Sequence, residues 1–137
     1  MFKLRAANAA DLSRIHAIET TCFSEDAQTR RSLQYLLTRA NARTLVALRK
    51  GETHGELCGY TTILFRRNSR VARLYSIAVV SAMRRYKLAG ALVQAGERYA
   101  VEAAGARWMR LEVRISNHAS RRLFATLGYQ DCGSLPG

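Results

Sequence analysis

The order of three segments in the second half of the chain constrains the fold more than any other feature of the sequence. Val71 to Val80 is rich in β-branched and apolar residues, which is typical of a strand. From Tyr86 to Ala104 the apolar residues recur at helical spacing, and Gly105 follows where a helix C-cap belongs. Trp108 to Ile115 alternates two unlike faces, as a second strand does. Because a strand–helix–strand crossover normally joins parallel strands with a right-handed connection, we expect these two strands to run parallel in one sheet.

The first half of the chain predicts three more strands and two helices. Phe2 to Arg5 alternates apolar and basic residues like a short strand, and Asn8 then offers its side chain as the N-cap of a first helix. Thr29 caps a second helix in the same way. Thr44 to Leu48 and Cys58 to Phe65 have strand character, and we expect them to form an antiparallel meander with the strand that follows.

The end of the chain predicts one further helix and one further strand. Asn117 caps the helix, Gly128 ends it, and Tyr129 to Cys132 begins the strand. With 137 residues, of which 48% are hydrophobic, the chain can bury one core, so we expect residues 1–137 to form a single domain. The order of elements predicts an α+β (mixed α/β) fold with a mixed sheet.

The formal net charge of +12 comes almost entirely from arginine, since Lys3, Lys50 and Lys87 are the only lysines. Such a field favours a polyanionic partner, and contact with a nucleic acid or the ribosome is one alternative. A cofactor that carries phosphate groups would benefit from the same field. No apolar run is long enough to span a membrane or to serve as a signal peptide, so we expect a cytoplasmic protein without a membrane partner.

Cysteine and histidine usage indicates neither disulfides nor a metal site. Cys22, Cys58 and Cys132 are odd in number and far apart, without CxxC spacing, so we expect them to be reduced core thiols. The three histidines are equally scattered, and we expect no bound metal.

The segment from Val80 to Arg85, between the first parallel strand and the long helix, contains no acidic residue. A strand that runs into an uncapped helix N-terminus presents free backbone N–H groups and the positive end of the helix dipole, which suits a phosphate group. Arg84, Arg85 and Lys87 add positive charge there. Arginines at a helix start also serve solubility alone, so both interpretations stay open at this point.

The same region carries a family motif. Leu74 to Val79, followed by Arg84 to Val93, resembles the acetyl-CoA motif of GNAT N-acetyltransferases, Arg/Gln-x-x-Gly-x-Gly/Ala. In this register Arg84 takes the first position and Ala89 the last. Lys87 stands where the family has its first glycine, which is a departure from the pattern.

A second block strengthens the resemblance. Leu111 to Ala119, together with Leu123-Phe124 and Leu127 to Tyr129, is similar to the family's Leu-Glu-Val-Arg-x-x-Asn-x-x-Ala-x-x-Leu-Tyr-x-x-Leu-Gly-Phe block. It resembles most the ribosomal-protein-alanine and protein N-terminal acetyltransferases. The resemblance implies a GNAT-like central sheet, mostly antiparallel with one parallel, splayed strand pair, and helices on both faces.

The family normally continues with a final strand where this sequence reaches Leu135 to Gly137. We expect the domain to lack that strand. The alternatives are a fragment, missing or disordered C-terminal residues, and a domain completed by another chain, such as the partner in a homodimer.

The resemblance also implies a reaction, in which an amine attacks acetyl-CoA directly. The acceptor would be the N-terminus of a protein or peptide, or a small amine. A loop between the first two helices, here Cys22 to Gln28, usually shapes the acceptor pocket in this fold. The residues implied to bind acetyl-CoA are Ile77, Ala78, Val79, Arg84, Arg85, Tyr86, Lys87, Leu88, Ala89, Gly90, Asn117 and Phe124.

Glu112 matches the family position that often serves as general base, and the alternative is a surface salt bridge with Arg110 or Arg114. Phe124 stands where the family usually has the tyrosine that protonates the leaving thiolate. These features leave two other functions open: a non-catalytic acyl-CoA-binding or regulatory domain, and an arginine-rich binder of nucleic acid or the ribosome.

Overall fold

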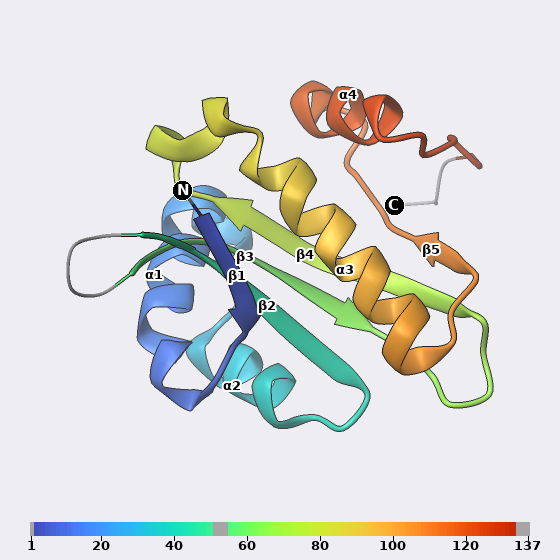
Figure 1. Ribbon diagram of the computed structural model, residues 1–137. Coiled ribbons are helices and arrows are strands. Elements are labelled where there is room, and N and C mark those ends of the chain that lie inside the picture. The colour runs from blue at the N-terminus through green and yellow to red at the C-terminus, as the bar shows by residue number, and fades with distance from the viewer. Residues whose placement is uncertain (1, 51–54, 134–137) are drawn as a thin grey trace.

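The computed structural model describes residues 2–50 and 55–133, and its sheet has the strand order β1-β2-β3-β4-β5 (Figure 1). All neighbouring strands are antiparallel except β4 and β5, which are parallel as predicted. The strands are β1 (Phe2–Ala6), β2 (Ala42–Arg49), β3 (Glu56–Leu64), β4 (Val71–Val79) and β5 (Trp108–Arg110). The α-helices are α1 (Leu12–Phe23), α2 (Arg30–Thr38), α3 (Leu88–Ala104) and α4 (His118–Thr126), and the 3-10 helices are η1 (Ala9–Asp11), η2 (Ser24–Asp26) and η3 (Ser81–Tyr86).

Helices cover both faces of the sheet, as predicted (Figure 1). On one face, α1 and α2 bury apolar side chains such as Ile15 and Leu33 against Val46 and Tyr60. On the other face, α3 packs Leu92 against the strands, and α4 adds its one fully buried residue to that side of the core. The central strand β3 is buried on both faces because helices lie above and below it. None of the described helices is long and apolar enough to cross a membrane.

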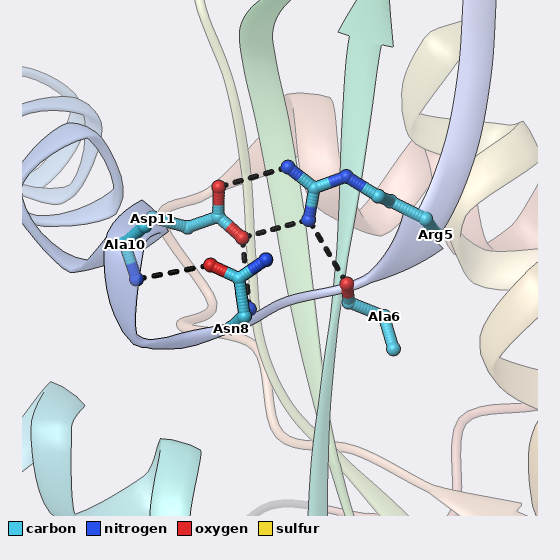
Figure 2. Close-up of polar contacts among 5 residues, drawn as sticks. All are labelled: Arg5, Ala6, Asn8, Ala10 and Asp11. Carbon is cyan, nitrogen blue, oxygen red and sulfur yellow. Dashed lines mark hydrogen bonds and ion pairs between the residues drawn. The ribbon is translucent and has the colours of Figure 1, made fainter.

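The connection from β1 to α1 is fixed by a capping box (Figure 2). Asn8 accepts a hydrogen bond from the backbone N–H of Ala10, and the Asp11 carboxylate accepts one from the backbone N–H of Asn8. Arg5, near the end of β1, holds the same carboxylate with both terminal nitrogens, at 2.8 and 2.9 Å. This hydrogen-bonded pairing lowers the pKa of Asp11 and ties the first strand to the first helix.

A β-bulge in β4 changes which side chains face which helices. The pairing with β3 skips Tyr75, because Leu74 and Ser76 lie opposite consecutive residues of β3. Leu74 packs in the cluster under α3, whereas Ala78 packs in the cluster under α1. Plain alternation would have put both on one face, so the extra residue turns Ser76 and Ala78 toward the α1 side.

The parallel pair β4–β5 is short. It joins Val71–Arg73 to Trp108–Arg110, and beyond this point the rest of β4 has no β5 residue beside it among the described residues. Our prediction of a strand from Trp108 to Ile115 is therefore wrong at its C-terminal end. The chain leaves the sheet after Arg110 and turns into α4, as Figure 1 shows. Beyond this point the backbones of β4 and of the segment that follows β5 diverge (Figure 1), and we call the region between these two backbones the gap. Side chains from both sides, among them Ile77 and Leu111, pack against the core there.

Two predictions about the end of the chain are also wrong. Tyr129 to Cys132 forms no strand, because Tyr129 donates its backbone N–H to Phe124 and packs its ring against that residue at the end of α4. Cys132 is exposed and is not a core thiol, unlike the buried Cys58. The segment Leu135 to Gly137, after which a final strand was expected, lies outside the described residues.

Candidate functional site

The backbone groups of β4 near its C-terminal end face the gap. Val80 donates its N–H to the Cys58 carbonyl at 2.9 Å, and the register places Val79 opposite Gly59. In an antiparallel pair, hydrogen-bonded and non-hydrogen-bonded positions alternate. Ile77 and Val79 are therefore non-hydrogen-bonded positions, and their N–H and C=O groups point away from β3. Because β5 does not follow β4 this far, these groups point into the gap.

The N-terminus of α3 lies just beyond this edge and has no side-chain cap. Its first turn contains no acidic residue, and the helix runs for 17 residues from Leu88 to Ala104. The uncapped start is thus confirmed, although the helix begins slightly later than predicted and η3 precedes it. Free N–H groups and the positive end of the dipole are available there for an anion.

Lys87 joins η3 to α3 in the left-handed conformation, with φ of 59° and ψ of 27°. Glycine adopts this conformation without cost, whereas other residues do not. The left-handed backbone therefore explains why the family has glycine at this position, and it is strained with Lys87 in its place. Lys87 is exposed, Leu88 is buried, and Ala89 and Gly90 are half-buried along the start of the helix.

Arg84 does not extend freely into solvent. Its Nε donates to the Val79 carbonyl at 3.2 Å, and its Nη2 lies 3.8 Å from Cys22 Sγ. Arg84 thus donates a hydrogen bond to the Val79 carbonyl, which faces the gap, and this bond joins η3 to the end of β4. The side chains of Arg85 and Tyr86 lie outside the described part of the structure.

Glu112 lies in the segment after β5 and makes an ion pair with Arg73 of β4, at 3.3 Å. The expected surface partners were Arg110 and Arg114, so the partner prediction is wrong. Both side chains are 44% exposed, and the carboxylate therefore remains in contact with water. Arg73 also stacks over the ring of Tyr75. Whether Glu112 acts as a base stays a prediction.

Asn117 and Phe124 have well-defined structural roles in α4. Asn117 caps the helix, with its Oδ1 accepting from Ser120 N–H at 3.1 Å, as predicted. Phe124 is buried and meets Tyr129 edge-on, with ring centroids 5.3 Å apart. Tyr129 donates its phenolic proton to Glu97 of α3 at 2.6 Å. Burial and this hydrogen bond raise the pKa of Tyr129, so the hydroxyl of the residue that packs on Phe124 is held by Glu97.

The loop between α1 and α2 borders the same gap. The predicted loop from Cys22 to Gln28 begins later, at Ser24, because Cys22 lies in the last turn of α1. Cys22 directs its thiol to the Val79 carbonyl at 3.7 Å. Asp26, at the end of η2, makes an ion pair of 3.0 Å with Arg114, which follows β5. The loop therefore spans from the end of β4 to the segment after β5. Among the described residues, no three or more His, Cys, Asp or Glu side chains gather to hold a metal ion.

Comparison with known proteins identifies the family. The model of the acetyltransferase (GNAT) family matches residues 12–129. The chain belongs to this family. No curated protein sequence matches this GNAT chain.

Solved GNAT-like structures share the whole fold at low sequence identity. The aminoglycoside acetyltransferase AAC(6')-Iy, in complex with the bisubstrate analogue CoA-S-monomethyl-acetylneamine, has a TM-score of 0.85 and 17% identity, and the match covers 100% of this chain and 96% of that one. NAA60 of Arabidopsis thaliana with a bisubstrate analogue has a TM-score of 0.79 and 20% identity over 95% of this chain and 85% of that one. AAC(6')-Ih of Acinetobacter baumannii has a TM-score of 0.80 and 21% identity, with 100% and 96% coverage.

One feature of this GNAT chain was missed at the level of sequence. Glu19 of α1 is only 3% exposed, and it accepts hydrogen bonds from the Tyr60 hydroxyl and from the backbone N–H of Gln28. Burial and the bond to Glu19 raise the pKa of Tyr60. The sequence does indicate that Glu19 is buried, because Glu19 lies four residues after Ile15 and therefore on the apolar face of the helix.

Proposed function

We propose that this GNAT chain is an acetyl-CoA-dependent N-acetyltransferase, with a primary amine as acceptor. The observation that carries the proposal is the gap beside β4, where the backbone groups of Ile77 and Val79 lead to the uncapped N-terminus of α3. Aminoglycosides appear as acceptors in the names of two structural neighbours, and NAA60 is similar over most of its length. These likenesses support an amine acceptor.

The residues present fit acetyl-CoA. Its phosphates suit the free N–H groups at the start of α3 and the positive charge of Lys87, in a chain with a net charge of +12. Its amide-containing arm matches the outward N–H groups of Ile77 and Val79 and the outward C=O group of Ile77, which would bind it as they would bind a strand, whereas the Val79 carbonyl already accepts from Arg84 and Cys22. The cofactor supplies the acetyl group as an activated thioester.

Two groups of the chain would assist the transfer. The Val79 N–H is fixed by β4, and a fixed donor of this kind stabilises developing oxyanion charge by about 3 kcal/mol. Glu112 is in contact with water and can take the proton from the amine through a water molecule. An α-amine, with a pKa near 8, is easier to deprotonate than a lysine, with a pKa near 10.4, which favours N-terminal acceptors.

The source of the proton for the leaving thiolate differs from the family pattern. Phe124 has no proton to donate, and the Tyr129 hydroxyl is bonded to Glu97. We therefore assign this step to water from the gap. A non-catalytic acyl-CoA-binding domain is the second candidate, and the buried phenylalanine is the observation that favours it.

The test has a binding step and a turnover step. Acetyl-CoA should raise the melting temperature, because it would bind only the folded chain. Free thiol is then measured with a peptide that begins with alanine, with the same peptide blocked at its N-terminus, and with sisomicin. Stabilisation without thiol release above background would support the non-catalytic domain. Neither stabilisation nor thiol release, together with salt-dependent RNA binding, would support the nucleic-acid alternative.

Replacement of Glu112 by glutamine tests its assigned role. We expect kcat to fall about a hundredfold, as for loss of a general base. The free energy of unfolding should change by less than about 1 kcal/mol, because an exposed ion pair contributes little. Arg73→Gln is the matched control, since it removes the same ion pair and keeps the carboxylate. Equal kcat values for Glu112→Gln and the unchanged chain would reduce Glu112 to a surface partner of Arg73.

A further inference from the structure

Glu19 is a buried carboxylate without a cationic partner among the described residues. A charge in this position is costly unless hydrogen bonds replace its water. Both oxygens of Glu19 are satisfied in that way: Oε1 by the Tyr60 hydroxyl of β3 and Oε2 by the Gln28 backbone N–H, at 2.8 Å. One side chain of α1 therefore joins the centre of the sheet to the last residue of the loop that follows α1.

The loop from Ser24 to Gln28 has a strained backbone, which other contacts must hold in place. Ser24, where α1 ends, has φ of 48° and ψ of −111°, a conformation that is unfavourable for a residue with a Cβ. Strained backbone persists where the surroundings hold it. On the sheet side of the loop, Cys22 contacts the Val79 carbonyl, while the exposed pair between Asp26 and Arg114 holds the far side. Of these contacts, only the bond between Tyr60 and Glu19 is fully buried, whereas the Gln28 and Cys22 bonds are partly buried. The exposed ion pair is a weak restraint.

We infer that Glu19 is a positioning residue for the acceptor: it holds the loop from Ser24 to Gln28 in place beside the gap, with Tyr60 as its anchor on the sheet. The inference rests on the proposed function, because this loop contacts both the end of β4 and the segment after β5, between which the amine would react. Loss of the hydrogen bonds to Glu19 should weaken acceptor binding. Acetyl-CoA binding should not change, because the start of α3 and the outward groups of β4 do not depend on Glu19.

The amide of Glu19→Gln can replace both contacts. Its oxygen can accept from the Gln28 N–H, and its NH₂ group can donate to the Tyr60 oxygen. The Tyr60 O–H, which no longer donates to residue 19, can turn and donate a hydrogen bond to Ser76 Oγ. Ser76 Oγ is buried near the Tyr60 hydroxyl and has no other hydrogen-bond partner among the described residues. The glutamine variant therefore removes the carboxylate but keeps both hydrogen bonds and the position of the loop. Glu19→Ala removes the carboxylate and both hydrogen bonds.

The experiment compares these two variants with wild type. Exchange of the Gln28 amide proton is followed by NMR, and KM is measured for acetyl-CoA and for a peptide that begins with alanine. In Glu19→Ala we expect Gln28 exchange and the peptide KM to rise about tenfold each, as for the loss of one hydrogen bond, while the acetyl-CoA KM changes less than about twofold. Glu19→Gln should remain within about threefold of wild type in all three quantities.

The second carboxylate–phenol pair of the molecule supplies the control. Tyr129→Phe breaks the bond to Glu97 on the opposite side of the sheet, and it should lower the melting temperature without raising the peptide KM. If Glu19→Ala does not fold, Tyr60→Phe removes one anchor only and should give smaller changes in the same direction. A rise of the peptide KM in Glu19→Gln as large as in Glu19→Ala would overturn the inference, and so would a parallel rise of the peptide and acetyl-CoA KM values. If wild type does not acetylate the peptide, the proposed N-terminal acceptor fails, while the Gln28 exchange still decides whether Glu19 holds the loop.

Discussion

At the scale of single residues, the departures from the family motif have structural meaning. Lys87 occupies a left-handed position, and Phe124 fills a buried position next to a second aromatic ring. Each of these positions can be changed back to the family's residue. The two changes should act differently, because one concerns the backbone and the other the environment of a hydroxyl group.

Lys87→Gly should stabilise the fold by about 1 kcal/mol, since it removes the left-handed strain. Urea unfolding measures the gain. Lys87→Ala is the matched control: it removes the same charge but keeps a Cβ, and it should not stabilise. Equal stabilisation by both variants would mean that charge repulsion, and not the backbone, is relieved. Both variants should weaken acetyl-CoA binding, because each removes a cation near the start of α3.

Phe124→Tyr should leave kcat equal or raise it, because it restores a hydroxyl at the family's position for the general acid. The new hydroxyl enters a buried site, so we also expect a loss of about 1 to 3 kcal/mol in the free energy of unfolding where it finds no partner. Steady-state kinetics and urea unfolding measure the two effects. A severe loss of kcat in a folded variant would mean that the pocket around α4 is organised differently.

At the scale of elements, the position of α3 depends on how closely it approaches β3. A Cβ on Gly96 would lie 2.8 Å from Ile63 Cδ1, whereas a Cβ on Gly90 would meet only Leu127 Cδ2, at 3.8 Å. Both glycines are in the same helix, but only Gly96 is required by packing. The tight contact brings the middle of this helix close to β3.

Alanine at these two glycines should therefore have opposite effects. Gly96→Ala should destabilise the fold by about 1 to 3 kcal/mol through overpacking against the buried Ile63. Gly90→Ala should stabilise it by about 0.5 to 1 kcal/mol, because alanine favours a helix and the space is free. The free energies of unfolding in urea provide the comparison, and a stabilised Gly96→Ala would show that α3 can move away from the sheet.

At the scale of the whole molecule, the buried phenol of Tyr60 and the partly buried phenol of Tyr129 make stability depend on alkaline pH. Burial is the main cause that raises the pKa of Tyr60 and Tyr129, and the hydrogen bonds to Glu19 and Glu97 add to it. A raised folded pKa favours the protonated, folded form. This contribution is complete below the unfolded pKa of about 10 and is lost as the pH rises toward the folded values.

The free energy of unfolding should consequently fall above about pH 10, by up to about 1.4 kcal/mol per pH unit for each phenol. Urea unfolding across this range measures the slope. Tyr60→Phe and Tyr129→Phe should each make the slope shallower, and the double variant should retain only the dependence that other groups cause. A double variant with the wild-type slope would refute the assignment to these phenols.

The local signals of the sequence determined most of the elements, although β5 ends earlier and α3 begins later than these signals predicted. Asn8, Thr29, Asn117 and Gly105 act on backbone groups within a few residues, so their capping roles could be predicted without tertiary contacts. The change of hydrophobic period in the second half determined the parallel strand pair. The first motif spans the end of β4, η3 and the start of α3, and the second spans the irregular segment after β5 and α4. The family could therefore be predicted from the residues of the motifs and not from the elements alone.

Only the tertiary structure decided which side chains meet. The bulge at Tyr75 depends on the register between two strands, and it reversed the direction of the side chains that follow it. The partners of Glu112 and Glu19 come from β4, β3 and a loop, none of which is implied by the neighbouring sequence. The early end of β5 is likewise set by the connection to α4. The strand–helix–strand order therefore determined the fold, whereas long-range pairing created the gap and its borders, because such contacts depend on distances that no local pattern encodes.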